Sequence, residues 1–291
     1  MFGQLITAMI TPFNEENQID WNGVEKIIEH LIATGSDSIV VVGTTGESPT
    51  LSHDEKIELF RFAVDQAKGR VKIIAGTGSN NTAQTVQLTK EAEKCGVDGC
   101  LLVVPYYNKP AQAGLYQHFE TIANETSLPI MLYNIPGRTG VNMSVETMVQ
   151  LSKLDNIVAI KESSGDMDQI TRLIASVDKS TEVYSGDDYL LLPILSVGGK
   201  GVVSVASHLV GKQIKELIEQ FKNGNVREAT NLNQQLYPIY KGLFITSNPV
   251  PVKYALSQKG FCQPYVRAPL AELNEQEKNA TDHWLREIEI G

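Results

Sequence analysis

Short runs of apolar, often β-branched residues alternate along the chain with longer stretches in which apolar residues recur with a helical period. The short runs are Leu5–Ile10, Ser38–Val42, Val71–Ala75, Gly99–Val104, Ile130–Tyr133, Ile157–Lys161, Glu182–Ser185 and Gly201–Val205. Most of these runs are continuously apolar and do not alternate with polar residues, which is typical of a parallel sheet covered on both faces. They therefore predict eight buried parallel strands.

The amphipathic segments between these runs predict helices. They are Trp21–Ala33, His53–Ala67, Thr82–Cys95, Ala113–Glu125, Ser144–Leu154 and Met167–Ser176. N-cap residue types stand at Asp20, Ser52, Asn81 and Asn142, and glycines stand at expected helix ends at Gly35 and Gly96. Eight strand–helix units in about 220 residues fit one (β/α)8, or TIM, barrel.

Beyond the eighth strand the chain stays helical in pattern. The segments Gln213–Asn223, Arg227–Ile245 and Glu275–Ile288 carry periodic apolar residues, and no low-complexity linker precedes them. We therefore expect an α/β protein with a catalytic barrel over residues 1–222. A C-terminal helical extension is expected over residues 223–291.

Composition narrows the class of protein. The formal net charge is −9, and the basic residues are scattered among acids, which argues against nucleic-acid binding. Three cysteines without CxxC spacing predict reduced thiols in a cytoplasmic protein. The N-terminus lacks a basic leader, and no apolar run approaches the ~20 residues that a membrane helix needs. We expect neither a signal peptide nor a membrane segment.

The sequence does not predict a metal or an organic cofactor. The histidines, which are His30, His53, His118, His208 and His283, are far apart in the sequence and form no HxH or HxxxH pair. No G-x-G-x-x-G or P-loop motif is present. Residues Gly198–Gly201 near the last strand could hold a phosphate, as barrels often do there, but a tight turn is the favoured interpretation.

Chemically capable side chains follow the predicted strands, where the active site of a TIM barrel lies. The segments at these strand ends are Gly43–Glu47, Pro105–Tyr107, Tyr133–Arg138, Lys161–Ser164 and Ser185–Asp188. We therefore expect one lysine, several tyrosines, two threonines and one arginine to meet at one end of the barrel.

Lys161 ends an apolar strand, where partial desolvation should favour its free amine. A free amine can attack a ketone and form an imine, which serves as an electron sink for making or breaking a carbon–carbon bond. The alternative is a strand-end lysine that reaches solvent beside Glu162. Glu162 should point to the opposite face of the strand and is therefore a poor partner for Lys161. Position alone does not choose between these hypotheses.

The other strand-end residues also allow two interpretations. Tyr133 could transfer a proton, or it could pack at the barrel rim. The turn Gly43–Glu47 offers N–H groups and hydroxyls for a carboxylate, or it could be a structural loop. Arg138 could clamp a second carboxylate, or it could be a surface arginine.

With these residues identified, the sequence resembles the dihydrodipicolinate synthase / N-acetylneuraminate lyase family of class I aldolases over essentially its whole length. The family signatures are Gly43-Thr-Thr-Gly-Glu-Ser48 and Tyr133-Asn-Ile-Pro-Gly-Arg-Thr139, with Ile160-Lys-Glu-Ser163 at the expected spacing. The segments Val104–Pro110, Tyr184–Asp188 and Asn248–Lys253 resemble the synthase branch in particular.

The resemblance implies an enzyme that condenses pyruvate with L-aspartate 4-semialdehyde to give 4-hydroxy-tetrahydrodipicolinate, without a cofactor. This is the first committed step of lysine biosynthesis through diaminopimelate. Lys161 would form the Schiff base with pyruvate. Tyr133 would relay protons through Thr44 and Tyr107, and Thr45 would hold the pyruvate carboxylate.

The resemblance also implies how the substrates and the subunits are arranged. Arg138 would bind the aldehyde carboxylate, and Gly186 and Val203 would line the pyruvate pocket. Val203 stands where many relatives have isoleucine, a difference of one methylene. Tyr107 would be donated by a neighbouring subunit, which implies a dimer of dimers, a homotetramer.

A possible effector site follows from the same resemblance. Some family members bind L-lysine at the dimer interface, and part of that pocket is matched by Ser48, His53, Asn80 and Tyr106. Inhibited members have glutamate where this chain has Gln84 and histidine where it has Lys56. We therefore expect weak inhibition by lysine.

Two rival functions remain open at this point. A sister enzyme, such as a lyase for N-acetylneuraminate or a 2-keto-3-deoxy-sugar acid, would share Lys161 and Tyr133 but would accept a polyhydroxylated aldehyde. Arg138 and the Tyr106–Tyr107 pair speak against it, because a sugar aldehyde needs neutral hydrogen-bonding groups. A catalytically silent binding barrel is disfavoured because every catalytic position is filled.

Overall fold

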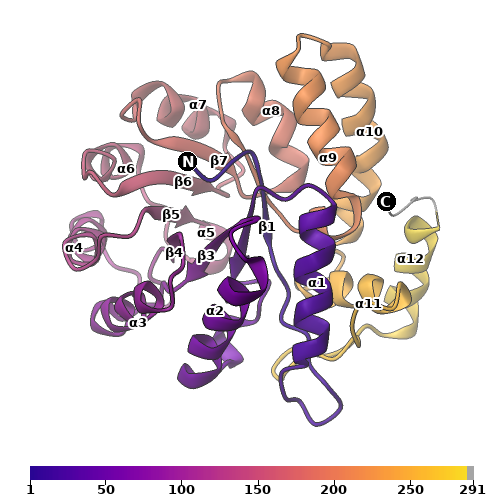
Figure 1. The fold of residues 1–291 in the computed structure, drawn as a ribbon. Helices are drawn as coiled ribbons and strands as arrows, with labels where there is room; N and C mark the ends of the chain where they lie inside the picture. Colours follow the sequence, from indigo (N-terminus) through magenta and orange to yellow (C-terminus); the bar gives the residue numbers. More distant parts are fainter. Residues whose placement is uncertain (287–291) are drawn as a thin grey trace. The chain divides into compact units, whose positions relative to one another are not determined.

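The computed structural model describes residues 1–286 and contains eight strands in one closed parallel barrel, ordered β1 to β8 (Figure 1). The strands are β1 (Leu5–Ala8), β2 (Ser38–Val41), β3 (Lys72–Gly76), β4 (Gly99–Val103), β5 (Ile130–Asn134), β6 (Ile157–Glu162), β7 (Glu182–Ser185) and β8 (Gly201–Ser204). Every residue of β1, β2, β5 and β8 is buried. Burial on both faces explains why the strands are continuously apolar in sequence, and the predicted barrel is confirmed.

The helices follow the strands in alternation. They are α1 (Trp21–Ala33), α2 (His53–Ala67), α3 (Thr82–Lys94), α4 (Gln112–Ala123), α5 (Pro136–Thr139), α6 (Val145–Leu151), α7 (Met167–Ser176), α8 (Leu191–Ser196), α9 (Ser207–Lys222), α10 (Val226–Gly242), α11 (Val250–Gln258) and α12 (Glu275–Leu285). Short 3-10 helices lie at Ser48–Thr50 and Asp188–Leu190. None of the helices in residues 1–286 is long and apolar enough to cross a membrane.

The chain consists of two compact units. The central unit comprises Met1 with Ile73–Val203, and the terminal unit comprises Phe2–Lys72 with Ser204–Gly291. In the central unit, strands from β3 onward pair in parallel, and α3, α4, α6 and α7 pack each against the next.

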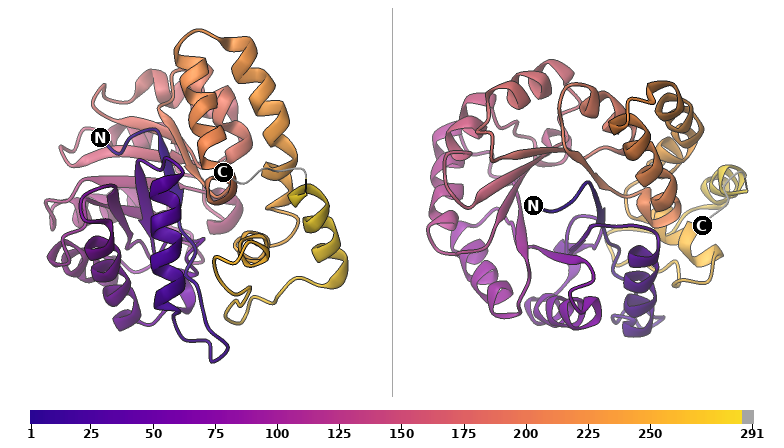
Figure 2. Two further views of the ribbon diagram at one scale, coloured as in Figure 1. Left: turned by 45° about the vertical axis from the view of Figure 1, so that its right-hand side comes forward. Right: turned by 45° about the horizontal axis from the view of Figure 1, so that its top comes forward.

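In the terminal unit, β1 pairs in parallel with β2, and α1 packs on α2 and α9. The helices α9 and α10 lie side by side, and α12 contacts both α10 and α11 (Figure 2). The C-terminal helical extension is therefore present. The expected division after residue 222 falls between α9 and α10, and it stays a prediction.

Local signals placed most helix ends correctly, with one exception. Asp20, Ser52 and Asn81 cap α1, α2 and α3, as predicted. Asn142 does not cap α6, because Ser144 accepts the capping hydrogen bond from the N–H of Thr147. Asn142 instead donates to Gln169 Oε1 at 2.7 Å and accepts from Asn134 Nδ2 at 2.8 Å. The prediction was wrong because these tertiary bonds hold Asn142 two residues before the cap.

The sequence patterns did not indicate a contact between two histidines or three of the helices. His30 and His208 are far apart in sequence, yet His30 Nε2 lies 2.8 Å from the carbonyl oxygen of His208. The short α5, α8 and α11 were not predicted. The end of the predicted helix Glu275–Ile288 lies partly outside the described residues. The tight turn at Gly198 is confirmed, since Gly199 N–H donates to Ile194 O at 2.8 Å and Gly198 has a left-handed φ of 99°.

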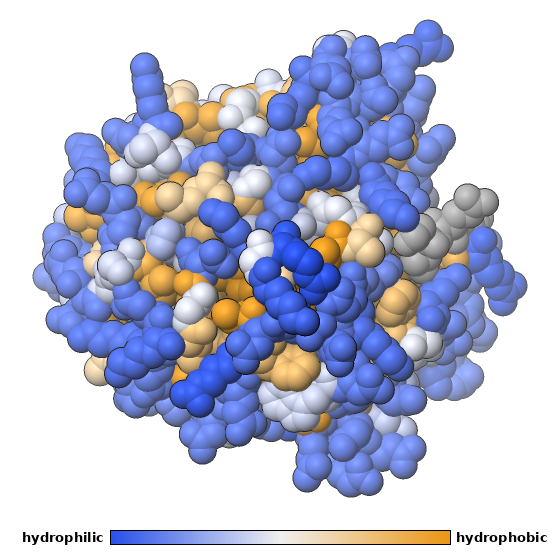
Figure 3. All heavy atoms as spheres, in the orientation of Figure 1, coloured by the Kyte–Doolittle hydropathy of each residue, from blue (hydrophilic) through white to orange (hydrophobic). Residues whose placement is uncertain are grey.

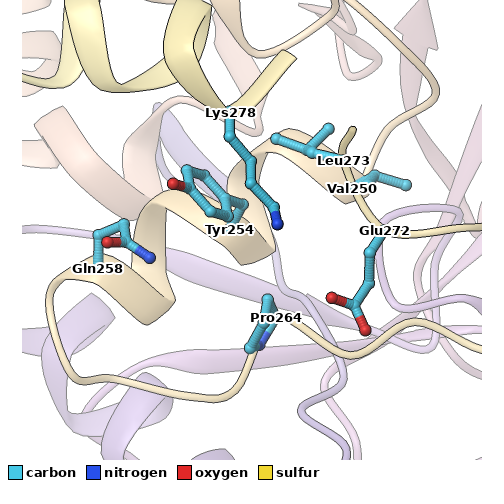
Figure 4. Close-up of a pocket in the computed structure, with 7 residues that line it drawn as sticks. All are labelled: Val250, Tyr254, Gln258, Pro264, Glu272, Leu273 and Lys278. Carbon is cyan, nitrogen blue, oxygen red and sulfur yellow. The ribbon is translucent and has the colours of Figure 1, made fainter. Parts of the chain in front are cut away.

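Two features of the surface are a mostly hydrophilic face (Figure 3) and a cavity that none of the predicted catalytic residues line. Hydrophilic residues cover most of the face seen in Figure 3, interrupted by smaller apolar areas. A cavity of about 300 Å³ in the terminal unit is lined by Val250, Tyr254, Gln258, Pro264, Glu272, Leu273 and Lys278 (Figure 4). Two polar groups of this cavity pair locally: Lys278 donates to Glu275, and Tyr254 donates to Asp282.

Candidate active site

Lys161 and Tyr133 stand at the same level on neighbouring strands. In the β5–β6 pairing, Tyr133 is the register partner of Lys161, and in the β6–β7 pairing Lys161 is the partner of Tyr184. Lys161 is 6% exposed and Tyr133 is 5% exposed. The Lys161 Nζ atom lies 4.0 Å from the centroid of the Tyr133 ring. The amine is therefore buried against an aromatic ring, and it does not extend into solvent.

Burial changes the acid–base behaviour of Lys161. Desolvation, partly opposed by the charges of Asp187 and Asp188, lowers the pKa of Lys161 to about 8. The positive charge of Arg138 lowers this pKa slightly further. At pH 7 roughly a tenth of the amine is therefore unprotonated, far more than at the ordinary lysine pKa, and a nucleophilic amine requires this form.

Glu162 lies on the other side of β6. Its carboxylate accepts hydrogen bonds from Asn134 Nδ2 at 3.0 and 3.2 Å, and from the N–H of Ser164 at 2.6 Å. Gln169 Nε2 approaches the carboxylate at 3.4 Å. Desolvation raises the pKa of Glu162. This network holds the ends of β5 and β6 and directs the acid away from Lys161, as the alternation of strand side chains predicted.

Gly186 leaves space for Lys161. A Cβ atom added at Gly186 would lie 1.9 Å from Ser163 Oγ and 2.9 Å from Lys161 Cε. Both distances are far below van der Waals contact. Gly186 therefore belongs to the surroundings of the amine.

Asp187, Asp188 and Ser163 also surround the amine, although the sequence patterns indicate no role for them. The two aspartates set part of the electrostatic environment of Lys161. Ser163 Oγ is buried and has no hydrogen-bond partner within residues 1–286. The aspartates could have been found from their position after strand 7, whereas the proximity of Ser163 to Gly186 needed the structure.

Arg138 lies on α5, a single helical turn that begins at Pro136 and is followed by Gly140 in the left-handed region. Its side chain is exposed. The neighbouring Thr139 is buried and donates to the carbonyl oxygen of Ile135 at 3.0 Å. The turn is thus anchored by Thr139 while the guanidinium stays accessible to a ligand.

Tyr107 projects from the loop after β4. It has a left-handed φ of 75° and is 88% exposed, although it is a large aromatic residue. Such a backbone conformation is unfavourable for residues other than glycine. The next residue, Asn108, donates through Nδ2 to the carbonyl oxygen of Asn80 at 2.9 Å and fixes the loop. Tyr106 is half-buried in the same loop.

The turn after β2 carries Thr44 and Thr45 in the terminal unit. It is closed by bonds from Gly46 N–H to Gly43 O and from Glu47 N–H to Thr44 O, each 3.1 Å long. Thr45 is 2% exposed, and its Oγ1 accepts a hydrogen bond from Asn248 Nδ2 at 2.9 Å. The structure thus presents the predicted threonines in one tight, buried turn.

The remaining predicted residues are divided between the units. Val203, at the end of β8, is buried in the central unit, which also contains Asn80. Ser48 and His53 lie in the terminal unit, at the 3-10 turn and at the first position of α2. No cluster of three potential metal ligands occurs within the part of the chain that the structure describes.

Comparison of the sequence with known proteins identifies one family and its members. Residues 1–288 match the model of the family described as "Dihydrodipicolinate synthetase family". The chain is 55% identical to the 4-hydroxy-tetrahydrodipicolinate synthase of Desulforamulus reducens over 95% of this chain and 94% of the relative.

Solved structures agree with this comparison. The dihydrodipicolinate synthase of Bacillus anthracis superposes with a TM-score of 0.97 at 47% identity, covering 99% of each chain. A lysine-bound structure of the enzyme from Cyanidioschyzon merolae superposes with a TM-score of 0.96 at 44% identity, covering 98% of each chain.

The lowered pKa of Lys161 predicts a distinctive pH dependence of its reactivity. The unprotonated fraction rises with pH, so labelling of Lys161 by an amine-reactive anhydride should increase through a midpoint of about 8. Asp187→Asn should move the midpoint to lower pH, because it removes a charge that favours the ammonium. Mass spectrometry of the tryptic peptide measures the labelling, with the exposed Lys259 as an internal reference for the reagent. A midpoint near 10.5 would contradict the assignment.

Proposed function

Because the chain belongs to the dihydrodipicolinate synthetase family, we propose that Lys161 and Tyr133 carry out its reaction. The reaction is the condensation of pyruvate with L-aspartate 4-semialdehyde to give 4-hydroxy-tetrahydrodipicolinate. It begins the diaminopimelate route of lysine biosynthesis. The observation that most directly supports the assignment is the buried Lys161 amine, with a pKa lowered to about 8, 4.0 Å from the Tyr133 ring.

The chemistry follows from an unprotonated amine. Lys161 attacks the keto carbon of pyruvate, water leaves, and an imine forms. Loss of a methyl proton gives an enamine, which attacks the aldehyde carbon and forms the new carbon–carbon bond. The amino group of the joined product then attacks the imine carbon, closes the ring and releases Lys161 as a free amine.

Each step needs groups that move protons or bind charge. Tyr133 acts as the proton donor and acceptor during imine and enamine formation, with Thr44 and Tyr107 as its relay. Thr45 and the adjoining N–H groups bind the pyruvate carboxylate. Arg138 binds the carboxylate of the aldehyde.

Two further residues, Gly186 and Val203, shape the space around the imine. Gly186 leaves the volume that the pyruvyl group occupies, and Val203 contributes an apolar wall to the same pocket. No metal ion or organic cofactor takes part in these steps. The three thiols are free, which is consistent with a protein of the cytoplasm.

Borohydride trapping tests the nucleophile and the substrate together. Incubation with pyruvate and borohydride should add one reduced pyruvyl group to the tryptic peptide that contains Lys161. Lys161→Arg should abolish trapping and nearly all activity, because a guanidinium stays protonated and cannot form the imine. Label on another lysine would refute the mechanism. Turnover with a sugar aldehyde and none with L-aspartate 4-semialdehyde would assign the chain to the sister lyases.

Arg138 should recognise the aldehyde and not pyruvate. If binding of the aldehyde carboxylate desolvates the exposed Arg138 guanidinium, Arg138→Ala should weaken transition-state binding by roughly 2–5 kcal/mol, seen as a higher KM for the semialdehyde and slower turnover. Trapping of pyruvate should survive, because pyruvate does not contact the guanidinium. Arg172→Ala, at an exposed arginine of α7, serves as the matched control. Equal loss of pyruvate trapping in Arg138→Ala would show that Arg138 holds the site together.

The exposure of Tyr107 supports a shared site in a homotetramer built as a dimer of dimers. If Tyr107 completes the site of a neighbouring subunit, a mixture of Tyr107→Phe and Lys161→Ala chains should regain activity. A mixed dimer then contains one site with both intact residues. Each variant alone should be nearly inactive, and the assay compares the mixture with the sum of the two. Without complementation, Tyr107 would act in its own subunit or not at all.

Weak inhibition by L-lysine is proposed for the effector site that contains Ser48, His53, Asn80 and Tyr106. Gln84 replaces a carboxylate that would attract the lysine ammonium by roughly 1–4 kcal/mol. Lys56 is half-buried, and desolvation lowers its pKa. A dose–response curve should show little inhibition at millimolar lysine, and Gln84→Glu should strengthen it. Half-inhibition well below about 1 mM would contradict the proposal.

A further inference from the structure

A buried ion pair lies directly beside the threonine turn of the terminal unit. Lys253 Nζ donates to Glu47 Oε1 at 2.5 Å and to the carbonyl oxygen of Tyr265 at 2.8 Å. Both charged side chains are almost completely inaccessible, at 0% for Lys253 and 1% for Glu47. The ammonium also lies 4.0 Å from the centroid of the Phe13 ring. Burying two charges costs desolvation free energy, so packing alone does not explain this pair.

Glu47 is held at every polar atom of its carboxylate. Oε1 accepts from Lys253, and Oε2 accepts from the N–H of Arg267 at 2.9 Å. The guanidinium of Arg267 in turn binds Glu55 and the carbonyl oxygen of Thr50. Glu47 itself has a left-handed φ of 55°. A residue in this strained conformation keeps it only when its surroundings enforce it.

The same C-terminal segment reaches Thr45 directly. Asn248, five residues before Lys253, donates through Nδ2 to Thr45 Oγ1 at 2.9 Å, and both residues are buried. An amide N–H is only a donor, so Thr45 Oγ1 must accept this bond. The hydroxyl proton of Thr45 is then free to point at a ligand. The amide thus sets the direction in which Thr45 can donate.

We propose that Asn248 and Lys253 are positioning residues that hold the turn Thr44–Glu47 for binding of the substrate carboxylate. Asn248 orients the Thr45 hydroxyl, and Lys253 locks the end of the turn through Glu47. The proposal rests on the function given above for Thr45. Residues just before and within α11 would thus affect substrate affinity through the turn, although neither takes part in the chemical steps.

The first experiment tests Asn248 through substrate affinity. Asn248→Asp keeps the shape but replaces the donor by an acceptor, which draws the Thr45 proton away from the substrate and adds negative charge. The pyruvate KM should rise at least about tenfold, the size of one lost hydrogen bond to a charged group. The KM for the semialdehyde should not change. Asn279→Asp, at an exposed position of α12, is the control and should have the kinetics of the unaltered chain.

A neutral substrate analogue separates carboxylate binding from general damage. Borohydride trapping of methyl pyruvate, which lacks the carboxylate, should be as fast in Asn248→Asp as in the unaltered chain, while trapping of pyruvate slows. Equal slowing with both ketones, or no slowing with either, would overturn the role of Asn248. The variant Thr45→Val distinguishes a failure of the role proposed for Thr45 from a failure of the role proposed for Asn248. If it leaves the pyruvate KM unchanged, the function proposed for Thr45 fails. If it raises that KM and Asn248→Asp does not, only the positioning proposal fails.

The ion pair needs a variant that still folds. Lys253→Met alone leaves the Glu47 carboxylate buried and unpaired, and should lower the melting temperature. The double variant Lys253→Met/Glu47→Gln removes both charges and should recover much of that loss. Its pyruvate KM should remain raised at least about tenfold, because the link from the turn to Tyr265 is absent. Recovery of KM together with the melting temperature would show that the pair serves only folding. Lys259→Met, at an exposed lysine after α11, is the matched control.

Discussion

Desolvation of a single amine is the constraint on which the rest of the central unit depends. Lys161 has the Tyr133 ring, and not a carboxylate, at 4.0 Å, and burial makes its ammonium form unfavourable. Asp187 and Asp188 offset part of this effect. Without the aspartates the amine would lose its proton more readily, and with a carboxylate in direct contact it would keep it. The barrel thus sets the reactivity of the amine by balancing two opposing effects.

The terminal unit contains a second buried lysine, and there the neighbouring groups favour the charged form. Lys253 is as deeply buried as Lys161, and desolvation lowers its pKa as well. Here, however, Glu47 at 2.5 Å and the carbonyl oxygen of Tyr265 stabilise the charged form. The environment of one buried lysine therefore favours a free amine, as the proposed nucleophile needs, and that of the other favours a structural cation. The difference lies in their neighbours and not in the depth of burial.

The features of this protein that could be predicted are those that depend on local sequence patterns. The strands were visible because both of their faces are buried, and Lys161 was visible because it ends such a run. Contacts between distant segments left no comparable signal. The sequence predicts that Asn142 caps a helix, but in the structure it forms hydrogen bonds with Asn134 and Gln169. The Glu47–Lys253 pair joins residues 206 positions apart, and neither flanking sequence indicates that the other is near.

The opposite orientation of Lys161 and Glu162 has a consequence for how this chain tolerates change over evolution. Adjacent strand residues face opposite sides, so one position in β6 separates the amine from a buried acid. Substitutions elsewhere in the strand alter packing by degrees. Deletion of one residue of β6 before Lys161 would place a carboxylate opposite Tyr133, and insertion of one residue there would place the lysine among the amides of Asn134 and Gln169. The length of β6 ahead of Lys161 should therefore be under stricter selection than its composition.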